Sequence, residues 1–471
     1  GADRKMSGQS SQGNKLGLGE KLAFGAGNMN NLLMNNILNV LLNPIYNIAL
    51  GVSPALVGYA TAIPRLWDAV TDPVVGSLSD NFRSRWGRRK PFMVLGALIS
   101  ALSLIAIWLV PPVWGEYSKF LYLIAVSLVF YTGNTLFLVP YTGLGLALSD
   151  DYRERTNLFA YKAVVDALGG FLIPWFYWLV TRPCFESTLH GTRVLSLGLA
   201  VWIILFAAIP LCFCRERYDR SIARQEKVPI LKGIAETMRN RPFLLLTLSV
   251  TLMFFGFYAS SALGMYLNIY YIFGGVEKDA STYVGLSGTL WKVSSLAALP
   301  VIVLISRRFD KRNTFVVSMI LSLFGAVGGW WCIDPERPWL QVLPSILYGP
   351  GISCVLMLCD SMLADICDLD ELRGGVRREA MFGAIYGWFT KVGLTIALAL
   401  SGLLLVCTGF DVKFGAGQPE GTVFLMRVLA VTVPASGMLT AILLMAGYRL
   451  NAGRMAEVKR ELDARRRGSR S

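Results

Sequence analysis

The chain has 471 residues, of which 54% are hydrophobic and only 16% are charged, and its mean hydropathy is +0.50. A soluble globular domain carries about 25% charged residues, so the composition excludes an ordinary soluble protein and indicates a membrane protein. The net charge of +14 also raises the possibility of nucleic-acid binding, but the placement of the basic residues accounts for it without a nucleic acid.

Residues 1–22 are predicted to be a polar segment outside the membrane. Gly1–Lys5, which precede Met6, are interpreted as a tag remnant, and the Gly- and Ser-rich stretch up to Glu20 as cytoplasmic. No cleavable signal peptide is expected from this composition.

Twelve apolar runs follow, each long enough to cross a hydrocarbon core of about 30 Å as a helix. In lipid only helices and closed barrels satisfy the backbone polar groups, and runs of this length favour helices. We therefore predict an all-α membrane protein with twelve transmembrane helices at 23–48, 55–78, 92–112, 119–146, 157–181, 194–213, 243–273, 281–306, 313–332, 339–364, 380–407 and 422–447.

Basic residues gather in the loops on one side of these spans. They follow the second span (Arg83, Arg85, Arg88, Arg89, Lys90) and the eighth (Arg307, Arg308, Lys311, Arg312), and they fill the linker 215–242 and the tail 449–471. By the positive-inside rule, both termini are predicted to be cytoplasmic, in a multi-pass protein of the cell (inner) membrane.

The basic loop after the second span recurs in the second half of the chain, as "SDNFRSRWGRRKPF" and "SRRFDKRN". Repeated halves with a substrate site between them are typical of secondary transporters. The pattern predicts a major facilitator fold with two six-helix bundles, at 23–214 and 243–448, joined by the cytoplasmic linker 215–242.

Motifs of enzyme chemistry are not found in the sequence. There is no phosphate-binding Walker loop, no Gly-x-Ser-x-Gly and no His-Glu-x-x-His. The eight cysteines show no zinc or redox spacing. We therefore expect no enzyme activity, no cofactor, and no metal beyond a possible coupling sodium ion.

Ionisable residues within membrane spans are costly, and each is a candidate functional residue. Lys162 and Asp166 stand one helical turn apart and can satisfy each other. Asp360 is equally compatible with a role in a gate and a role in packing. For Lys292 the sequence does not favour either a structural or a functional role. The eight such residues are Arg65, Asp68, Asp72, Lys162, Asp166, Lys292, Asp360 and Lys391.

The stretch "PRLWDAVTDPVVG" places Arg65, Asp68 and Asp72 on one helical face, with Thr71 beside it. Two carboxylates one turn apart repel each other in low dielectric, so either one is protonated or a cation lies between them. Hard cations take oxygen ligands. We therefore predict a cation or proton site at Asp68, Asp72 and Thr71, with Arg65 close to it.

A stripe of asparagines runs along the first span. In one interpretation the amides bond neighbouring helices. In the other they line a water-filled cavity and bind a neutral, polyhydroxylated substrate, with aromatic rings supplying apolar faces. The stripe is Asn28, Asn31, Asn35, Asn39 and Asn43, and the candidate rings are Trp67, Trp291, Tyr386 and Trp388.

Four motifs, in register across both halves, resemble the glycoside–pentoside–hexuronide:cation symporter family, whose best-known member is the melibiose carrier. They are "WDAVTDPVVG…RSRWGRRKPF", "VPYTGLGLALSDDYRERT", "LADICDLDEL" and "RREAMFGAIYGWFTKVG". The resemblance implies that Asp68 and Asp72 bind the cation, that Thr135 assists, and that Lys391 lies near that site and the substrate. Thr71 stands where the melibiose carrier has Asn, which leaves sodium selectivity open.

The resemblance also implies a cytoplasmic gate, in which three acids meet three arginines: Asp365, Asp368 and Glu371 with Arg153, Arg155 and Arg377. The sequence departs from that of the melibiose carrier at the positions that bind the sugar. The melibiose carrier holds its sugar with two acids, and Leu32 and Leu138 stand at those positions here, so a galactoside clamped by carboxylates is not expected.

These observations favour a cation-coupled symporter that imports a sugar or glycoside by alternating access, driven by sodium or protons. An alternative within the fold is a carrier of lysophospholipids or other amphiphiles, or of sucrose-type sugars. A non-transporting membrane receptor is the third hypothesis. The expected partners are a small-molecule substrate and membrane lipids, with no nucleic acid, and the protein is expected to be a monomer.

Overall fold

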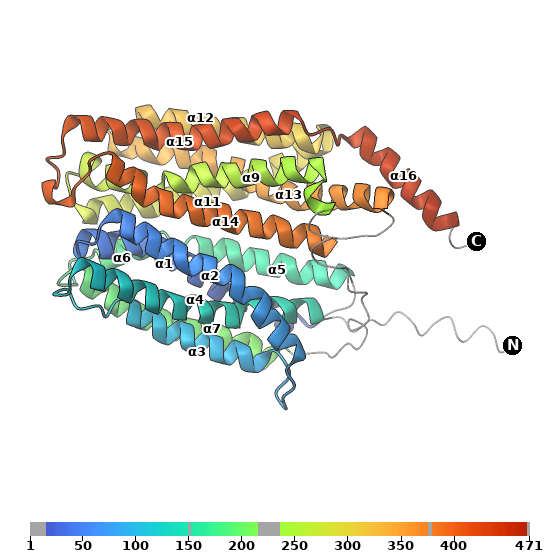
Figure 1. The fold of residues 1–471 in the computed structure, drawn as a ribbon, viewed down its shortest axis with the longest axis horizontal. Helices are drawn as coiled ribbons and strands as arrows, with labels where there is room; N and C mark the ends of the chain where they lie inside the picture. The colour runs from blue at the N-terminus through green and yellow to red at the C-terminus, as the bar shows by residue number, and fades with distance from the viewer. Residues whose placement is uncertain (1–15, 149–151, 215–235, 375–378, 469–471) are drawn as a thin grey trace. The chain divides into compact units, whose positions relative to one another are not determined.

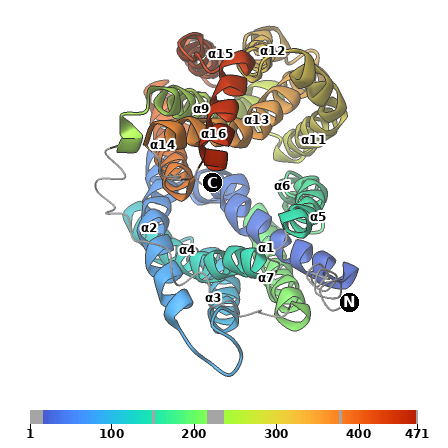
Figure 2. The ribbon, with the colours of Figure 1, turned by 90° about the vertical axis from the view of Figure 1, so that its right-hand side faces the viewer.

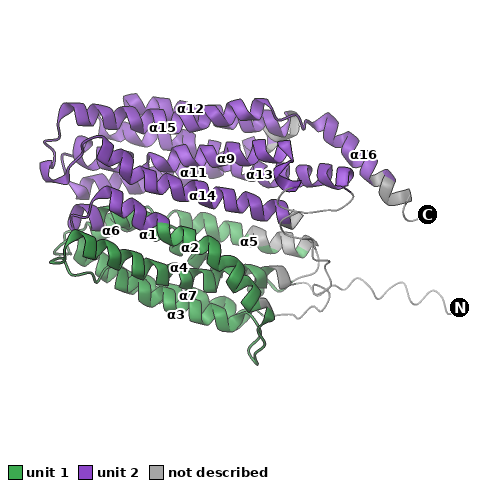
Figure 3. Cartoon of the chain, viewed as in Figure 1, with its two compact units in different colours: residues 1–45, 63–225 green, residues 46–62, 226–471 purple. Residues whose placement is uncertain are grey.

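A computed structural model of the chain describes residues 16–148, 152–214, 236–374 and 379–468. These residues form helices in two compact units (Figure 3), which comprise residues 1–45 and 63–225, and residues 46–62 and 226–471. The fold is that of an all-α membrane protein, and the described residues contain no strand. The predicted limits of the bundles and linker stay predictions.

The helices of the first half of the chain coincide with the first six predicted spans (Figure 1). They are α1 (Leu18–Leu42), which continues as the π-helical η1 (Asn43–Ala49), α2 (Pro54–Asn81), α3 (Lys90–Ile107), α4 (Glu116–Ala147), α5 (Tyr152–Gly170), α6 (Trp175–Val180) and α7 (Thr188–Phe213).

The second half contains the other six predicted spans and one further helix. Its elements are α9 (Arg241–Ala259), α10 (Ser261–Tyr266), the π-helical η3 (Leu267–Ile272), α11 (Glu277–Arg308), α12 (Lys311–Cys332), the short η4 (Pro338–Val342), α13 (Leu343–Gly374), α14 (Glu379–Cys407), the short η5 (Val412–Phe414), α15 (Glu420–Ala446) and α16 (Ala452–Gly468).

Nine helical segments in the described part of the chain are long and apolar enough to cross a membrane. The other three predicted spans coincide with α1, α2 and α11. The Asn stripe and the Arg65–Asp68–Asp72 face lower the apolar character of α1 and α2, whereas the side chains of residues 303 and 305–308, near the end of α11, lie outside the described residues. The count of twelve crossings stays a prediction.

Helix pairing repeats between the two units. In the first unit α3 packs against α4 and α7, and α1 packs against α5 and α7. In the second unit α12 packs against α13 and α15, and α9 packs against α14 and α15, as the view along the helices indicates for that unit (Figure 2). The repeated basic loops thus begin equivalent helices, α3 and α12, in equivalent surroundings.

The basic residues of the two loops make equivalent bonds. Lys90 donates to the carbonyl of Leu211, 2.7 Å away at the end of α7. In the second unit Arg312 donates to the carbonyls of Met445 and Ala446, 2.9 and 3.0 Å away at the end of α15. The last carbonyls of a helix lack intrahelical donors, so the two loops cap α7 and α15, the helices of the last predicted span in each half of the chain.

Close helix crossings depend on small residues. Gly96 of α3 and Gly133 of α4 face each other, and a Cβ built on Gly96 would lie 2.6 Å from the carbonyl oxygen of Gly133. Small residues permit such approach between membrane helices. This crossing fixes α4, which carries Thr135, within the first unit.

Candidate functional site

The charged face of α2 meets α4 in the first unit. Thr135 of α4 donates to Asp68 Oδ1 at 2.5 Å. The hydroxyls of Thr71 and Thr135 lie 3.3 Å apart. Three of the four predicted cation-site residues therefore lie together, with four potential oxygen ligands counting both carboxylate oxygens of Asp68. Asp72 is half-buried one turn further along α2.

Two prolines bracket this face, Pro64 and Pro73 of α2. Proline has no N–H, so Pro73 cannot donate the usual helical bond to the carbonyl of Ala69, between Asp68 and Thr71. This carbonyl is a neutral oxygen close to the acid pair. Such oxygens, together with hydroxyls and carboxylates, are the ligands of hard cations.

Arg65 connects the charged face to the Asn stripe. Its Nη2 donates to the carbonyl of Asn35 at 3.1 Å and to Asn39 Oδ1 at 3.2 Å. Its guanidinium carbon lies 5.8 Å from the ring centroid of Tyr131. The positive charge of Arg65 is thus held by α1 and α4, one turn from Asp68.

The stripe forms a directional relay of amides. Asn35 Nδ2 donates to Asn31 Oδ1 at 2.7 Å, and Asn31 Nδ2 donates to Asn28 Oδ1 at 3.0 Å. Asn28 Nδ2 then donates to Asp166 Oδ1 of α5 at 3.0 Å. Two members of the stripe therefore bond other helices, Asn28 to α5 and Asn39 to α2, as the first interpretation expects. Asn31 and Asn35, between them, are half-buried.

Trp67 is 44% exposed and donates from Nε1 to the hydroxyl of Thr132 at 2.9 Å. An indole fixed by its N–H leaves its ring faces available for contact with an apolar face of a ligand. Trp67 precedes Asp68 on α2, so this part of the first unit presents an aromatic ring and a carboxylate at successive positions of one helix.

The candidate residues of the second unit differ in their surroundings. Trp388 is 53% exposed on α14, and Lys391 of the same helix is also exposed. Tyr386 instead packs against the buried core of this unit. Trp291 packs against that core too, with its ring 6.0 Å from the stacked ring of Tyr348.

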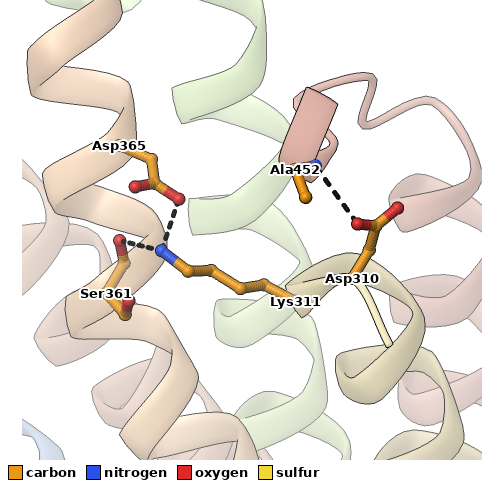
Figure 4. A network of polar contacts seen from close by, with 5 residues as sticks. All are labelled: Asp310, Lys311, Ser361, Asp365 and Ala452. Carbon is orange, nitrogen blue, oxygen red and sulfur yellow. Dashed lines mark hydrogen bonds and ion pairs between the residues drawn. The ribbon is translucent and has the colours of Figure 1, made fainter. Parts of the chain in front are cut away.

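Of the predicted gate residues, Asp365 is buried on α13 and is paired (Figure 4). Lys311 of α12 donates to Asp365 Oδ2 at 2.5 Å and to the carbonyl of Ser361 at 3.2 Å. Asp368 and Glu371 are half-buried further along α13. The side chains of Arg153 and Arg155, and all of Arg377, lie outside the described residues, so the gate network stays a prediction.

Several contacts were not predicted from the sequence. Lys311 was recognised only as a loop charge, although its equivalence to Arg89, which donates to Gly143 of α4, is readable from the repeated basic loops. A half-buried ion pair joins Lys21 of α1 to Glu154 of α5 at 2.7 Å. Nothing in the spacing of these two residues indicates that they meet, because they lie on different helices.

The described residues include no group of three or more His, Cys, Asp or Glu side chains that would hold a metal ion. A monovalent cation or a proton needs fewer charged ligands. The geometry of α2 and α4 suits that case: one carboxylate in contact with a hydroxyl, a second carboxylate one turn away, and a guanidinium nearby.

Residues 23–452 match the family described as MFS/sugar transport protein. The chain belongs to this family. The match spans both units, and it accounts for the repeated helix pairing and for the apolar helices. The recognition of a melibiose-carrier-like member of the major facilitator superfamily is confirmed.

Relatives within the MFS/sugar transport family are distant but extend along most of the chain. An uncharacterised symporter of Synechocystis is 26% identical over 98% of this chain and 99% of its own length. The glucuronide carrier protein homologue of Escherichia coli is 23% identical over 88% of this chain and 89% of its own. The human sodium-dependent lysophosphatidylcholine symporter 1 is 26% identical over 88% and 80%.

Solved structures of transporters share the fold of this family member. A bacterial homologue of the lysosomal transporter Spinster has a TM-score of 0.64 at 13% identity and covers 94% of this chain and 96% of its own. A D-xylose–proton symporter has a TM-score of 0.59 at 13% identity and covers 92% and 96%. At such identities the likeness shows the fold alone.

Proposed function

We propose that the protein is a cation-coupled secondary symporter that imports a sugar or glycoside by alternating access, with sodium or a proton as the coupling ion. The observation that carries the proposal is the contact between Asp68 and Thr135, with Thr71 beside them and Asp72 one turn away. We assign the cation to this cluster, with Lys391 and Arg65 near it.

The coupling follows from electrostatics. Two carboxylates one turn apart repel each other where the dielectric is low, and a bound cation or proton removes that repulsion. The ion thereby favours the conformer in which α2 and α4 hold the cluster together. If the same conformer binds substrate better, ion and substrate stabilise each other's binding.

The substrate proposal rests on the relay of neutral amides. Asn31 and Asn35 offer donors and acceptors on α1, and Trp67 offers a ring face on α2, which together suit a ligand with hydroxyl groups and an apolar ring face. On the other unit we assign Trp388, Tyr386 and Lys391 to the substrate. The likeness to the glucuronide carrier homologue supports a sugar derivative.

The alternative substrate is a lysophospholipid. Leu32 and Leu138 stand where the melibiose-carrier resemblance expects sugar-binding acids, and the chain is similar to the human lysophosphatidylcholine symporter. A thermal-shift screen in detergent with sugars, glycosides and lysolipids, with and without sodium, separates the two, because ligand stabilisation increases with occupancy. A stabilising sugar supports the proposal, and stabilisation by lysolipids alone contradicts it.

The test of coupling is uphill transport in proteoliposomes. Asp68→Asn and Asp72→Asn should each abolish accumulation of substrate against its gradient, while exchange of substrate across the membrane survives. Thr142→Ser is a control on α4, because Thr142 is exposed further along this helix and its hydroxyl donates to the carbonyl of Leu138 in the same helix. Accumulation by Asp72→Asn at the wild-type level would place the coupling site elsewhere.

A further inference from the structure

A pocket of about 350 Å³ lies in the second unit where four helices end. It adjoins the first residues of α9 and α16 and the last residues of α13 and α15. Its lining is Arg241, Pro242, Leu245, Leu369, Arg373, Gly447, Arg449, Leu450 and Arg454. We call it the arginine pocket.

Among the described residues, the four charged ones that line the arginine pocket are all arginines, and all four are exposed. Arg454 is paired with Glu457 at 2.7 Å on the surface of α16. For Arg241, Arg373 and Arg449, the structure of the described residues shows no side-chain hydrogen bond or ion pair. Three guanidinium groups therefore converge on one pocket whose described lining residues include no carboxylate.

A neighbouring pocket shows that this excess of positive charge is confined to the arginine pocket. It has a volume of about 410 Å³ and lies on the other side of Leu450, which lines both. Its charged lining is balanced, with Asp310 and Asp365 against Lys311 and Lys459. The basic composition of the linker and tail thus does not by itself make every pocket at this end of the unit cationic.

The floor of the arginine pocket is apolar. Leu245 lies one turn inside the membrane helix α9, and Leu369 belongs to the last turns of α13. Guanidinium groups bind phosphate through paired N–H donors, and leucines favour hydrocarbon. An anion with a phosphate and an attached apolar portion matches both parts of the lining better than a free inorganic ion does.

We propose that the arginine pocket binds the head group of an anionic phospholipid, with Arg241, Arg373 and Arg449 around its phosphate and the leucines beside its glycerol backbone. The pocket lies at the ends of membrane helices, on the side where the chain's basic loops gather. Basic pockets of this kind, at the membrane surface, recognise anionic lipid head groups.

The test titrates the purified full chain in an uncharged detergent with dioctanoyl phosphatidylglycerol and follows the melting temperature. Each arginine near a lipid surface contributes enough that removing two should weaken the apparent Kd about 30-fold. The variant is Arg241→Gln/Arg449→Gln, and Arg373→Gln/Arg449→Gln is the second pair in case the first folds poorly. The matched control, Lys459→Gln/Arg460→Gln, removes the same charge from the exposed face of α16 and should bind as wild type does.

Two comparison ligands identify the source of the phosphate. Dioctanoyl phosphatidylcholine, with the same chains and no net charge, should bind at least about tenfold more weakly, and inorganic phosphate should not stabilise the protein at the same concentration. Asp68→Asn should bind phosphatidylglycerol as wild type does, which separates this site from the proposed transport site. Wild-type affinity in both arginine variants, equal binding of the two lipids, or equal stabilisation by inorganic phosphate would each overturn the proposal.

Discussion

At the scale of single residues, the asparagines of α1 divide into two kinds. Asn28 and Asn39 contact other helices through Asp166 and Arg65, whereas Asn31 and Asn35 bond along the stripe itself. An acceptor-only carboxylate at one end orients Asn28 and, through it, the next two amides. The stripe therefore contains interhelical contacts at Asn28 and Asn39 and a pre-oriented pair of amides between them.

Substitutions should separate these two kinds. Asn28→Ala should lower stability by about 0.6 kcal/mol, and by no more than about 1.7, as interhelical hydrogen bonds in membranes do. Asn35→Ala should leave stability nearly unchanged and weaken substrate binding by about 1–3 kcal/mol, because a substrate hydroxyl loses its partner. Melting temperature and Kd are measured on the same purified variants.

The control for the stripe is Asn36→Ala. Asn36 is also half-buried on α1, but its Nδ2 bonds the carbonyl of Leu32 in its own helix at 2.8 Å, so neither quantity should change. Unaltered substrate affinity in both Asn31→Ala and Asn35→Ala would refute the proposed role of the amides and remove the main support for a hydroxylated substrate.

Two cysteines near the end of α7 should differ in reactivity. Cys214 is fully buried, and this burial raises the pKa of its thiol to about 12. At pH 7 its thiolate fraction is then about 10⁻⁵, against a few per cent for an ordinary cysteine. Cys212, two residues earlier, is exposed. A variant that retains only Cys214 should label with maleimide far more slowly than one that retains only Cys212.

Denaturation provides the control for the labelling experiment. In sodium dodecyl sulfate both single-cysteine variants should label at similar rates, since burial no longer suppresses the thiolate. Rapid labelling of Cys214 in the folded protein would contradict the packing of α7 at this point.

At the scale of helices, length and hydropathy predicted where helices occur but not how they are interrupted. The predicted span 157–181 contains α5 and α6 with a turn between them, and 243–273 contains α9, α10 and η3. Apolar runs do not reveal such breaks, because hydropathy is the same in a helix and in a turn within it. A local signal was available at the first break, where Gly169, Gly170 and Pro174 disfavour a continuous helix.

One repeat was visible in the sequence but was not recognised. "IYNIALGV" (Ile45–Val52) and "IYYIFGGV" (Ile269–Val276) cover the ends of η1 and η3. Both segments end in a wide turn with a glycine at positive φ, 72° at Gly51 and 88° at Gly275. π-helical segments often mark functional positions in longer helices, and these two occupy equivalent places in the two halves of the chain.

Some features of the candidate site were predictable from the sequence and others were not. Helical periodicity placed Asp68 and Asp72 on one face, and the family resemblance identified Thr135, which the structure brings to Asp68. The bond from Asn28 to Asp166 was not predictable, because partners on different helices are set by packing. Periodicity gives the face of a helix and leaves its neighbour undetermined.

The C-terminal helix α16 was expected only as a basic tail. Its apolar residues Met455, Val458 and Leu462 recur at helical spacing and pack against Leu369 and Leu372 of α13. Its first residue is also fixed, since the N–H of Ala452 donates to Asp310 Oδ1 at 3.2 Å (Figure 4). A short polar helix of this kind depends on its packed face for stability.

Disruption of that face should release α16. Val458 is fully buried, so Val458→Asp places a carboxylate in an apolar contact and should detach the helix. Limited proteolysis should then cleave within 452–468 at least about tenfold faster, because the opened fraction of a segment governs its cleavage. Lys459→Asp, at the exposed neighbouring position, should be cut at the wild-type rate, and equal rates for both variants would show that α16 is not held by this face.

At the scale of the whole molecule, the repeated pairing of helices gives each unit its own framework. In each half of the chain, the helix of the first predicted span contacts those of the fifth and sixth spans. The helix of the third span contacts those of the fourth and sixth spans. The predicted cation site is built entirely from α2 and α4 of the first unit, whereas Trp388 and Lys391 belong to the second. In the proposed mechanism, the substrate binds residues of both units and the coupling ion binds at Asp68.

Coupling between ion and substrate should therefore be reciprocal. If sodium or protons tighten substrate binding by a given factor, the substrate must tighten binding of that ion by the same factor, typically about 5- to 150-fold. Calorimetric titration of purified protein measures both factors: substrate with and without the ion, then the ion with and without substrate.

In Asp68→Asn both factors should fall to about one, because the neutral amide has no charge for the ion to compensate. The exposed Asp279, near the start of α11, is the matched control, and Asp279→Asn should retain both factors. Substrate binding that is equally tight with and without either ion in the wild-type protein would contradict cation-coupled symport itself.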